Sequence, residues 1–275
     1  MSVGTIWPDG AQCAVVVTVN YDGESVERGE RPDGALWGRY SYGRYGVQAG
    51  LPRILAMLER LELAATFFVP GWDVERDPDI VRGIQAGGHE LAGHGYLHED
   101  FSLLSVEEQV QALERSEAAF ENVLGIRPSG WRAPRGLMTG DTRRILAERG
   151  YRYDSSYCDD DLPYLAAGDG GARLVEIPVF QTASDSHYYR LRRPPEVVEW
   201  AWRQEFDAIY RIGGLLNLTL HPRGDFGSGR AVRLRAVERF LREIRHYPGV
   251  WFTTCGALAD WALGPGSDAL ETWPI

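Results

Sequence analysis

Short apolar runs alternate with helix-like stretches along almost the whole chain, and this alternation limits its possible folds more than any other feature. The runs that read as strands are 13–19, 64–70, 89–94, 172–179, 215–222 and 249–254, with shorter strands before 131 and at 151–154. The stretches with helical periodicity are 51–63, 77–88, 105–125, 140–150, 195–214, 231–247 and 256–263. A repeated β-then-α order favours parallel strands. This number of units predicts an α/β fold with a closed or nearly closed barrel, and an open doubly wound sheet is the alternative.

The chain is expected to form a single domain over residues 1–275, because it shows neither an internal repeat nor a strong linker. Ser105 and Glu108 predict a capping box at the start of helix 105–125. The segment 22–50 is too long for an ordinary loop, so it is expected to line a site or form an oligomer contact. Its aromatic residues could cover a compact pocket; they are Trp37, Tyr40, Tyr42 and Tyr45.

The composition excludes several classes of function. A net charge of −10 and a pI near 5.2 argue against binding to a nucleic-acid backbone or to an anionic membrane surface. No apolar run is as long as a membrane span, and no secretory signal is visible at the start of the sequence. Three widely spaced cysteines are typical of reduced thiols, so we expect a cytoplasmic protein. All 29 basic residues are arginine, which removes lysine-based Schiff-base chemistry.

Polar side chains follow the predicted strands at their carboxyl ends, where barrel enzymes place their active sites. The candidates are Asn20, Asp22, Glu24, His94, His98, Arg132, Asp154 and His221. Each has a structural explanation when taken alone. An HxxxH spacing is more often structural than metal-binding, Asp22 could cap a turn, His221 could be a buried hydrogen-bonded histidine, and Arg132 could be an ion-pair partner.

Taken together, these residues predict a metal site. Two imidazoles and one carboxylate form a common ligand set for Zn²⁺ that leaves a position open for water, whose pKa falls to about 7 when bound. His89 begins its strand and is expected at the opposite end, and His187 and His246 are expected to be peripheral. The spacing does not match a zincin helix or a zinc finger, and Ser155 and Ser156 lack a nucleophile elbow.

Four motifs in this order resemble the polysaccharide deacetylase superfamily, also called carbohydrate esterase family 4 or the NodB-homology domain. They are "VNYDGE", "HGYLH", "RAPRG" and the strand end "LTLHP", and the resemblance covers roughly residues 13–260. It implies a distorted barrel of seven or eight β/α units, so residues 1–275 would be one NodB-homology catalytic domain. It further implies that Asp22, His94 and His98 hold one divalent metal ion.

The resemblance also assigns roles to other residues. His221 would protonate the leaving nitrogen, the backbone N–H of Arg135 would help to bind the oxyanion, and Arg132 would belong to the catalytic group. Asn20 stands at the position of the family's catalytic base, and Glu24 is a candidate replacement because it is close in sequence. The residues expected to contact substrate are Tyr21, Trp131, Arg135 and Asp154. The His₂Asp set accepts Co²⁺, Mn²⁺ or Ni²⁺ as well as Zn²⁺.

With an amide at the base position, the sequence resembles a divergent branch of the family. This branch contains allantoinase, cyclic-imide hydrolases and atypical peptidoglycan deacetylases. The first expectation is therefore a metal-dependent hydrolase that opens a small cyclic imide or ureide by metal-activated water. An N-deacetylase of peptidoglycan or chitin-like sugars is the alternative, and a ligand-binding barrel without turnover is the second alternative. The resemblance also implies a homo-oligomer that acts on a small-molecule substrate, while the composition argues against nucleic acid or a membrane as a partner.

Overall fold

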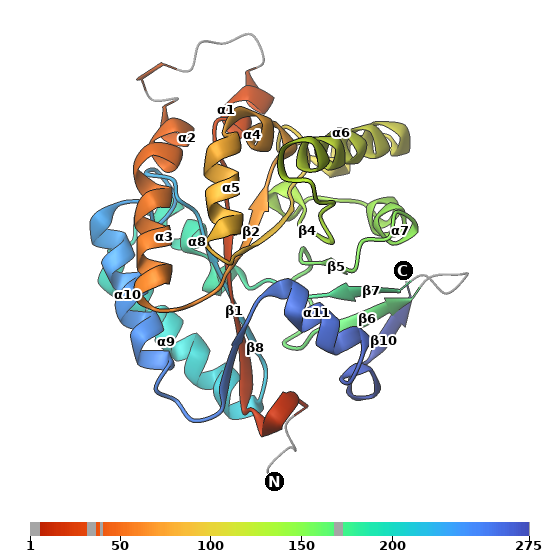
Figure 1. Ribbon diagram of the computed structural model, residues 1–275. Coiled ribbons are helices and arrows are strands. Elements are labelled where there is room, and N and C mark those ends of the chain that lie inside the picture. Colours follow the sequence, from red (N-terminus) through yellow and green to blue (C-terminus); the bar gives the residue numbers. More distant parts are fainter. Residues whose placement is uncertain (1–5, 32–36, 39–40, 168–172, 275) are drawn as a thin grey trace.

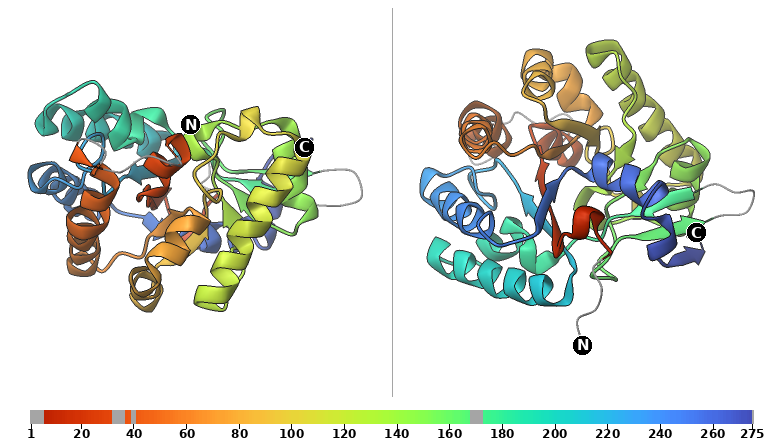
Figure 2. Two further views of the ribbon diagram at one scale, coloured as in Figure 1. Left: turned by 90° about the horizontal axis from the view of Figure 1, so that it is seen from above. Right: turned by 60° about the horizontal axis from the view of Figure 1, so that its bottom comes forward.

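The computed structural model describes residues 6–31, 37–38, 41–167 and 173–274. The strands form one curved sheet that helices surround, as seen from the side in Figure 1 and from above in Figure 2. The strands are β1 (Cys13–Asn20), β2 (Thr66–Val69), β3 (Glu90–Gly93), β4 (Gly130–Trp131), β5 (Tyr153–Asp154), β6 (Tyr164–Ala167), β7 (Arg173–Glu176), β8 (Leu215–Leu220), β9 (Val250–Thr253) and β10 (Thr272–Pro274). This arrangement confirms the predicted α/β barrel in its distorted form.

The sheet runs in the order β10-β6-β7-β5-β4-β3-β2-β1-β8, and all pairs are parallel except β6 with β7. Strand β1 is central because β8 pairs along one of its edges, while β2 and β9 share the other. Val15, Val17 and Val19 pack into one hydrophobic cluster, and Ala14 and Val16 pack into another. Burial on both faces explains why this strand is a continuous apolar run in the sequence.

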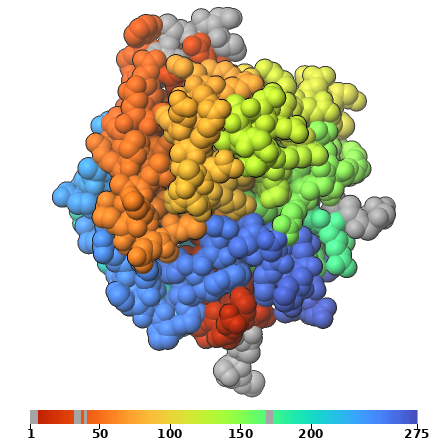
Figure 3. Space-filling view, viewed as in Figure 1, coloured from red at the N-terminus to blue at the C-terminus, as the bar shows by residue number. Residues whose placement is uncertain are grey.

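The helices that cover the sheet agree with the predicted stretches, with ends shifted by a few residues. They are α3 (Leu51–Arg60), α5 (Pro78–Ala86), α6 (Val106–Leu124), α7 (Gly140–Glu148), α9 (Pro195–Ile212), α10 (Ala231–Ile244) and α11 (Cys255–Leu263). The capping box of Ser105 and Glu108 is present, and Gly125 ends α6 with a left-handed φ of 68°. Helices α3 and α10 lie side by side although they are far apart in sequence (Figure 3).

The sequence prediction missed several short elements. The segment 22–50, in which no helix or strand was predicted, contains helix α1 (Ser25–Glu30), helix α2 (Tyr42–Tyr45) and a π-helical turn at Gly46–Gly50. Helices α4 (Gly71–Arg76) and α8 (Asp185–Arg190) and strands β6 and β10 were also missed. They are too short to show a period. Tyr40 lies outside the described residues. No helix in the described part of the chain is long and apolar enough to cross a membrane.

The π-helical turn packs directly against the loop that follows β8. Gly50 has helical φ and ψ angles, but a Cβ atom there would overlap the carbonyl oxygen of Pro222. Gly50→Ala should therefore lower the free energy of unfolding by about 1–3 kcal/mol or more, measured by urea denaturation. Gly83→Ala in α5 is the matched control, because a Cβ there meets no atom within 4 Å. The control should be neutral or slightly stabilising, and equal effects of the two changes would contradict this packing argument.

Candidate active site

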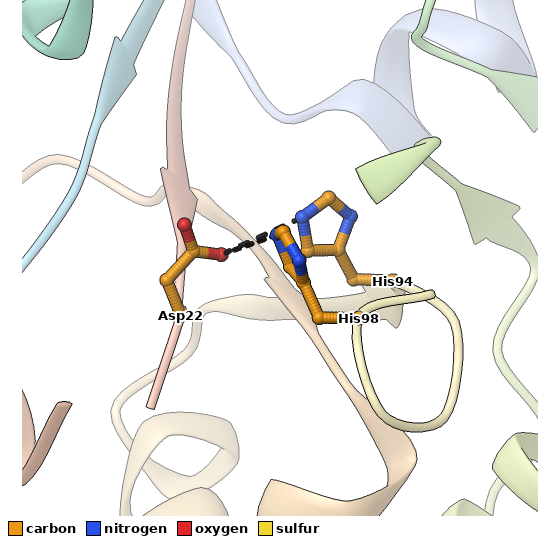
Figure 4. A group of neighbouring side chains, drawn as sticks. All are labelled: Asp22, His94 and His98. Atoms are coloured by element: carbon orange, nitrogen blue, oxygen red, sulfur yellow. Dashed lines mark ion pairs between the residues drawn. The ribbon is translucent and has the colours of Figure 1, made fainter. Parts of the chain in front are cut away.

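Asp22, His94 and His98 converge at the carboxyl ends of the strands. Asp22 follows β1, while His94 and His98 follow β3, and their side chains point toward one another (Figure 4). Asp22 Oδ1 lies 3.5 Å from Nε2 of each histidine. One ligand atom from each residue lies within 4.8 Å of the others, and all three side chains are buried. The structure therefore brings together the three residues predicted to hold a metal.

Neighbouring groups hold these three residues in place. The carbonyl oxygen of Arg132 lies 2.7 Å from His94 Nδ1, so that nitrogen donates and Nε2 keeps its lone pair. Asp22 and His98 have left-handed φ angles of 41° and 57°, which are uncommon for residues with side chains and often occur at functional sites. Asp73 of α4 supports the turn after Asp22 by accepting hydrogen bonds from backbone N–H groups.

The electrostatics of the cluster suit a cation. Burial would raise the pKa of Asp22, but the three surrounding histidines hold that pKa well below its usual range. Burial lowers the pKa of His98 to about 3, so its ring is neutral at neutral pH. Asp22 Oδ1 and His94 Nε2 are buried without a hydrogen-bond partner among the described residues. Because unpaired buried polar atoms are costly, this donor set fits a divalent metal ion.

His221 lies beside the cluster and is held by a carboxylate. Its Nε2 is 3.8 Å from Asp22 Oδ2, and its Nδ1 is 2.6 Å from Asp185 Oδ1. Asp185 Oδ2 also accepts from the backbone N–H groups of His221 and Ser228, so its position is fixed on three sides. The carboxylate places the ring proton on Nδ1 and leaves Nε2 facing the cluster, as required of a group that exchanges protons with a bound substrate.

Arg132 is buried between the strand ends and fixes the orientation of Asn20. Its guanidinium donates to Thr18 Oγ1 at 3.0 Å, to Asn20 Oδ1 at 3.0 Å and to both the backbone and side-chain oxygens of Ser155. Burial lowers the pKa of Arg132 to about 10, which keeps it protonated at neutral pH. Because Asn20 Oδ1 is held by this cation, its Nδ2 is directed toward His221 Nε2, 3.4 Å away.

A cavity of about 860 Å³ opens over these groups, near the upper end of the roughly 300–1,000 Å³ usual for ligand pockets. Asn20, Asp22, His98, Arg132 and His221 all line it. Tyr42 of the segment 22–50 also lines it, as expected for part of that segment. Arg135 lines it too, and its guanidinium pairs with Glu30 at 2.7 Å.

Four other predicted residues are not brought to the cavity. Tyr21 is fully buried with its hydroxyl bonded to Asp77, and Trp131 is fully buried against Phe101. Both are core residues rather than substrate contacts. Both residues lie at strand ends near the site, as predicted. However, successive side chains along an extended chain point to opposite sides, and these two point away from the site.

Glu24 and Asp154 are also turned away from the cavity. Glu24 pairs with Arg44 at 3.0 Å and with Arg76 at 3.9 Å, so it is not placed to replace the catalytic base. Asp154 is fully buried in register with Glu176 of β7 and accepts from Ser156 Oγ. Burial raises the pKa of both carboxyls. Asp154 is therefore a buried residue of the barrel interior and does not line the cavity.

The prediction for the remaining histidines is right in part. His89 Nδ1 accepts from the backbone N–H of Ala65, away from the cluster. His187, expected to be peripheral, lines the cavity from α8. Asp185 was missed altogether, because no sequence pattern marks a helix of six residues whose first side chain turns inward.

Comparisons with known proteins agree with this geometry. The polysaccharide deacetylase family description matches residues 40–153. The peptidoglycan deacetylase-like protein FGM2 of Gibberella zeae is 34% identical, over 87% of this chain and 83% of that protein. The peptidoglycan deacetylase of Helicobacter pylori is 26% identical, over 80% of this chain and 86% of that protein.

Solved structures agree as well. A crystal structure assigned to the polysaccharide deacetylases from Mycobacterium smegmatis has a TM-score of 0.91 and 36% identity, covering 98% of this chain and 95% of that one. The structure of PuuE allantoinase has a TM-score of 0.82 and 27% identity, covering 94% of this chain and 93% of that one. The chain therefore belongs to the polysaccharide deacetylase family, whose members hydrolyse carbon–nitrogen bonds other than peptide bonds.

Proposed function

We propose that this protein is a metal-dependent amidohydrolase that opens a carbon–nitrogen bond in a small cyclic imide or ureide. Asp22, His94 and His98 would hold one divalent ion, with Zn²⁺ the first expectation and Co²⁺, Mn²⁺ or Ni²⁺ also compatible with the donors. When bound there, such an ion supplies Lewis-acid polarisation and lowers the pKa of water to about 7. Binding of the substrate carbonyl and transfer of the proton would depend on side chains of the protein, Asn20 and His221.

The observation that carries the choice of substrate is the amide of Asn20. Arg132 occupies Asn20 Oδ1, so the side chain offers N–H groups to the cavity and cannot accept a proton. A deacetylase that relies on a carboxylate base at this position would lack it here. A donor suits a substrate carbonyl whose oxygen becomes more negative as the ring opens. The structural likeness to PuuE allantoinase supports the same choice.

His221 is the proton donor in this proposal. Asp185 holds its ring so that Nε2 faces the cavity, where it can take the proton that the attacking water loses and pass it to the nitrogen released as the ring opens. Asn20 would orient the attacked carbonyl through Nδ2–H. The exposed Arg135 would contact the outer part of the substrate.

An N-deacetylase acting on peptidoglycan or chitin-like sugars is the second candidate. Two relatives carry peptidoglycan deacetylase names. The volume of about 860 Å³ also exceeds what a bare five-membered ring requires. A binding protein without turnover is less well supported, because the complete Asp22, His94 and His98 set lies beside a carboxylate-held His221.

The setting of the protein is also part of the proposal. Cys13, Cys158 and Cys255 are all free thiols, which supports a reducing compartment such as the cytoplasm. A homo-oligomer is proposed from the family resemblance.

Zinc-loaded protein should open the ring of at least one compound from a panel of cyclic imides, hydantoins and allantoin, detected by mass spectrometry of the product. Asn20→Ala should lower kcat about 10²- to 10³-fold with the metal retained, because one hydrogen-bond donor to the developing oxyanion is lost. Asn122→Ala, on the exposed face of α6, is the control and should leave kcat unchanged. Acetate release from N-acetylglucosamine oligomers without ring opening would support the deacetylase instead.

Asp185→Asn tests the assignment of His221 as the proton donor. An amide at this position no longer fixes the proton on Nδ1, so kcat should fall about 10²- to 10⁴-fold with KM and metal content nearly unchanged. Asp207→Asn is the control, because Asp207 accepts a hydrogen bond from the Tyr247 hydroxyl and does not line the cavity. An unchanged kcat would remove Asp185 and His221 from the mechanism.

A further inference from the structure

Helix α8 presents a cation to the cavity that no acidic side chain in the described part of the chain balances. Arg190, the last residue of α8, is exposed and lines the cavity wall. Its guanidinium carbon lies 3.9 Å from the centre of the Phe226 ring. Within the described ranges, Arg190 forms no ion pair with a carboxylate.

The other arginines at the cavity contrast with Arg190. Arg223 also lies over Phe226, at 4.8 Å, but Glu27 and Asp225 neutralise it. Arg135 is paired with Glu30. The carboxylates that line the cavity are thus paired with other arginines, except Asp22, which faces His94 and His98.

Arg132 adds a second positive charge without a carboxylate partner among the described residues. Its N–H groups bond only neutral oxygens, including those of Thr18, Asn20 and Ser155. Arg132 therefore contributes a positive charge to the cavity wall but has no donor left for a ligand. Arg190 has such donors, because stacking on Phe226 covers the face of its guanidinium and leaves the N–H edges open.

Arg190 is also close to the reacting groups. The Phe226 ring that supports it contacts the ring of His221, with centroids 5.4 Å apart. A substrate bound near His221 can therefore reach Arg190 with a short side arm, and the cavity has room for one. We propose that the substrate carries a carboxylate and that Arg190 binds it; this rests on the proposed hydrolysis at the neighbouring metal cluster.

The test compares ligands that differ only in charge. Binding to zinc-loaded protein is measured by calorimetry for a hydantoin with an acetate arm and for the same hydantoin with an acetamide arm. N-acetylmuramic acid and its carboxamide form a second pair for the deacetylase alternative. Wild type should bind the carboxylate of one pair about 10- to 100-fold more tightly than its amide, as expected for a charge-assisted hydrogen bond.

Arg190→Gln should abolish this preference while leaving the affinity for the amide nearly unchanged. Arg115→Gln is the matched control, because Arg115 is an exposed arginine stacked 3.8 Å over Tyr96 and does not line the cavity. It should keep the wild-type preference. A preference that survives in Arg190→Gln, or wild type that binds neither carboxylate better than its amide, would overturn the proposal. Ring opening of the amide-armed hydantoin, measured separately, reports on the proposed hydrolysis whichever result is obtained.

Discussion

The buried guanidinium of Arg132 is the interaction on which the site depends. The guanidinium donates hydrogen bonds to Thr18 and Asn20 of β1 and to Ser155 beyond β5. The backbone carbonyl oxygen of Arg132 accepts from His94 and so orients its ring. Removing a buried cation from water costs several kcal/mol unless every N–H finds an acceptor. Because those acceptors come from different strands, the curvature of the sheet and the geometry of the site are fixed together.

The hydrogen bond from Arg132 to Asn20 also determines how an asparagine at position 20 differs chemically from a carboxylate. A carboxylate at position 20 would neutralise Arg132 and could accept a proton. The amide does neither, so it leaves the cation unbalanced and turns its own N–H groups toward the cavity. One residue thereby exchanges a base for a donor and makes the cavity more positive. In the proposed function, both consequences would favour a substrate with a carbonyl oxygen that gains negative charge or with an anionic group.

Much of the fold could be predicted from the sequence, because apolar runs and helix caps, as in 105–125, are local sequence signals of strands and helices. The three residues of the proposed metal site could be predicted because Asp22 and His94 lie just beyond strand ends, and His98 follows His94 at the HxxxH spacing. Asp185, Arg190 and Phe226 could not, since their roles depend on how a six-residue helix packs on a distant loop. Glu24 shows the converse limit: it lies two residues from Asp22, yet its side chain turns away to Arg44.

The central claim is that Asp22, His94 and His98 form one metal site. The most direct measurement is metal content by mass spectrometry after reloading with zinc, on wild type beside Asp22→Ala and His98→Ala, with His89→Ala as a histidine control outside the cluster. The account predicts about one ion per chain in wild type and the control, and loss of the ion in both cluster variants. Wild type without an ion, or cluster variants that retain it, would contradict the account.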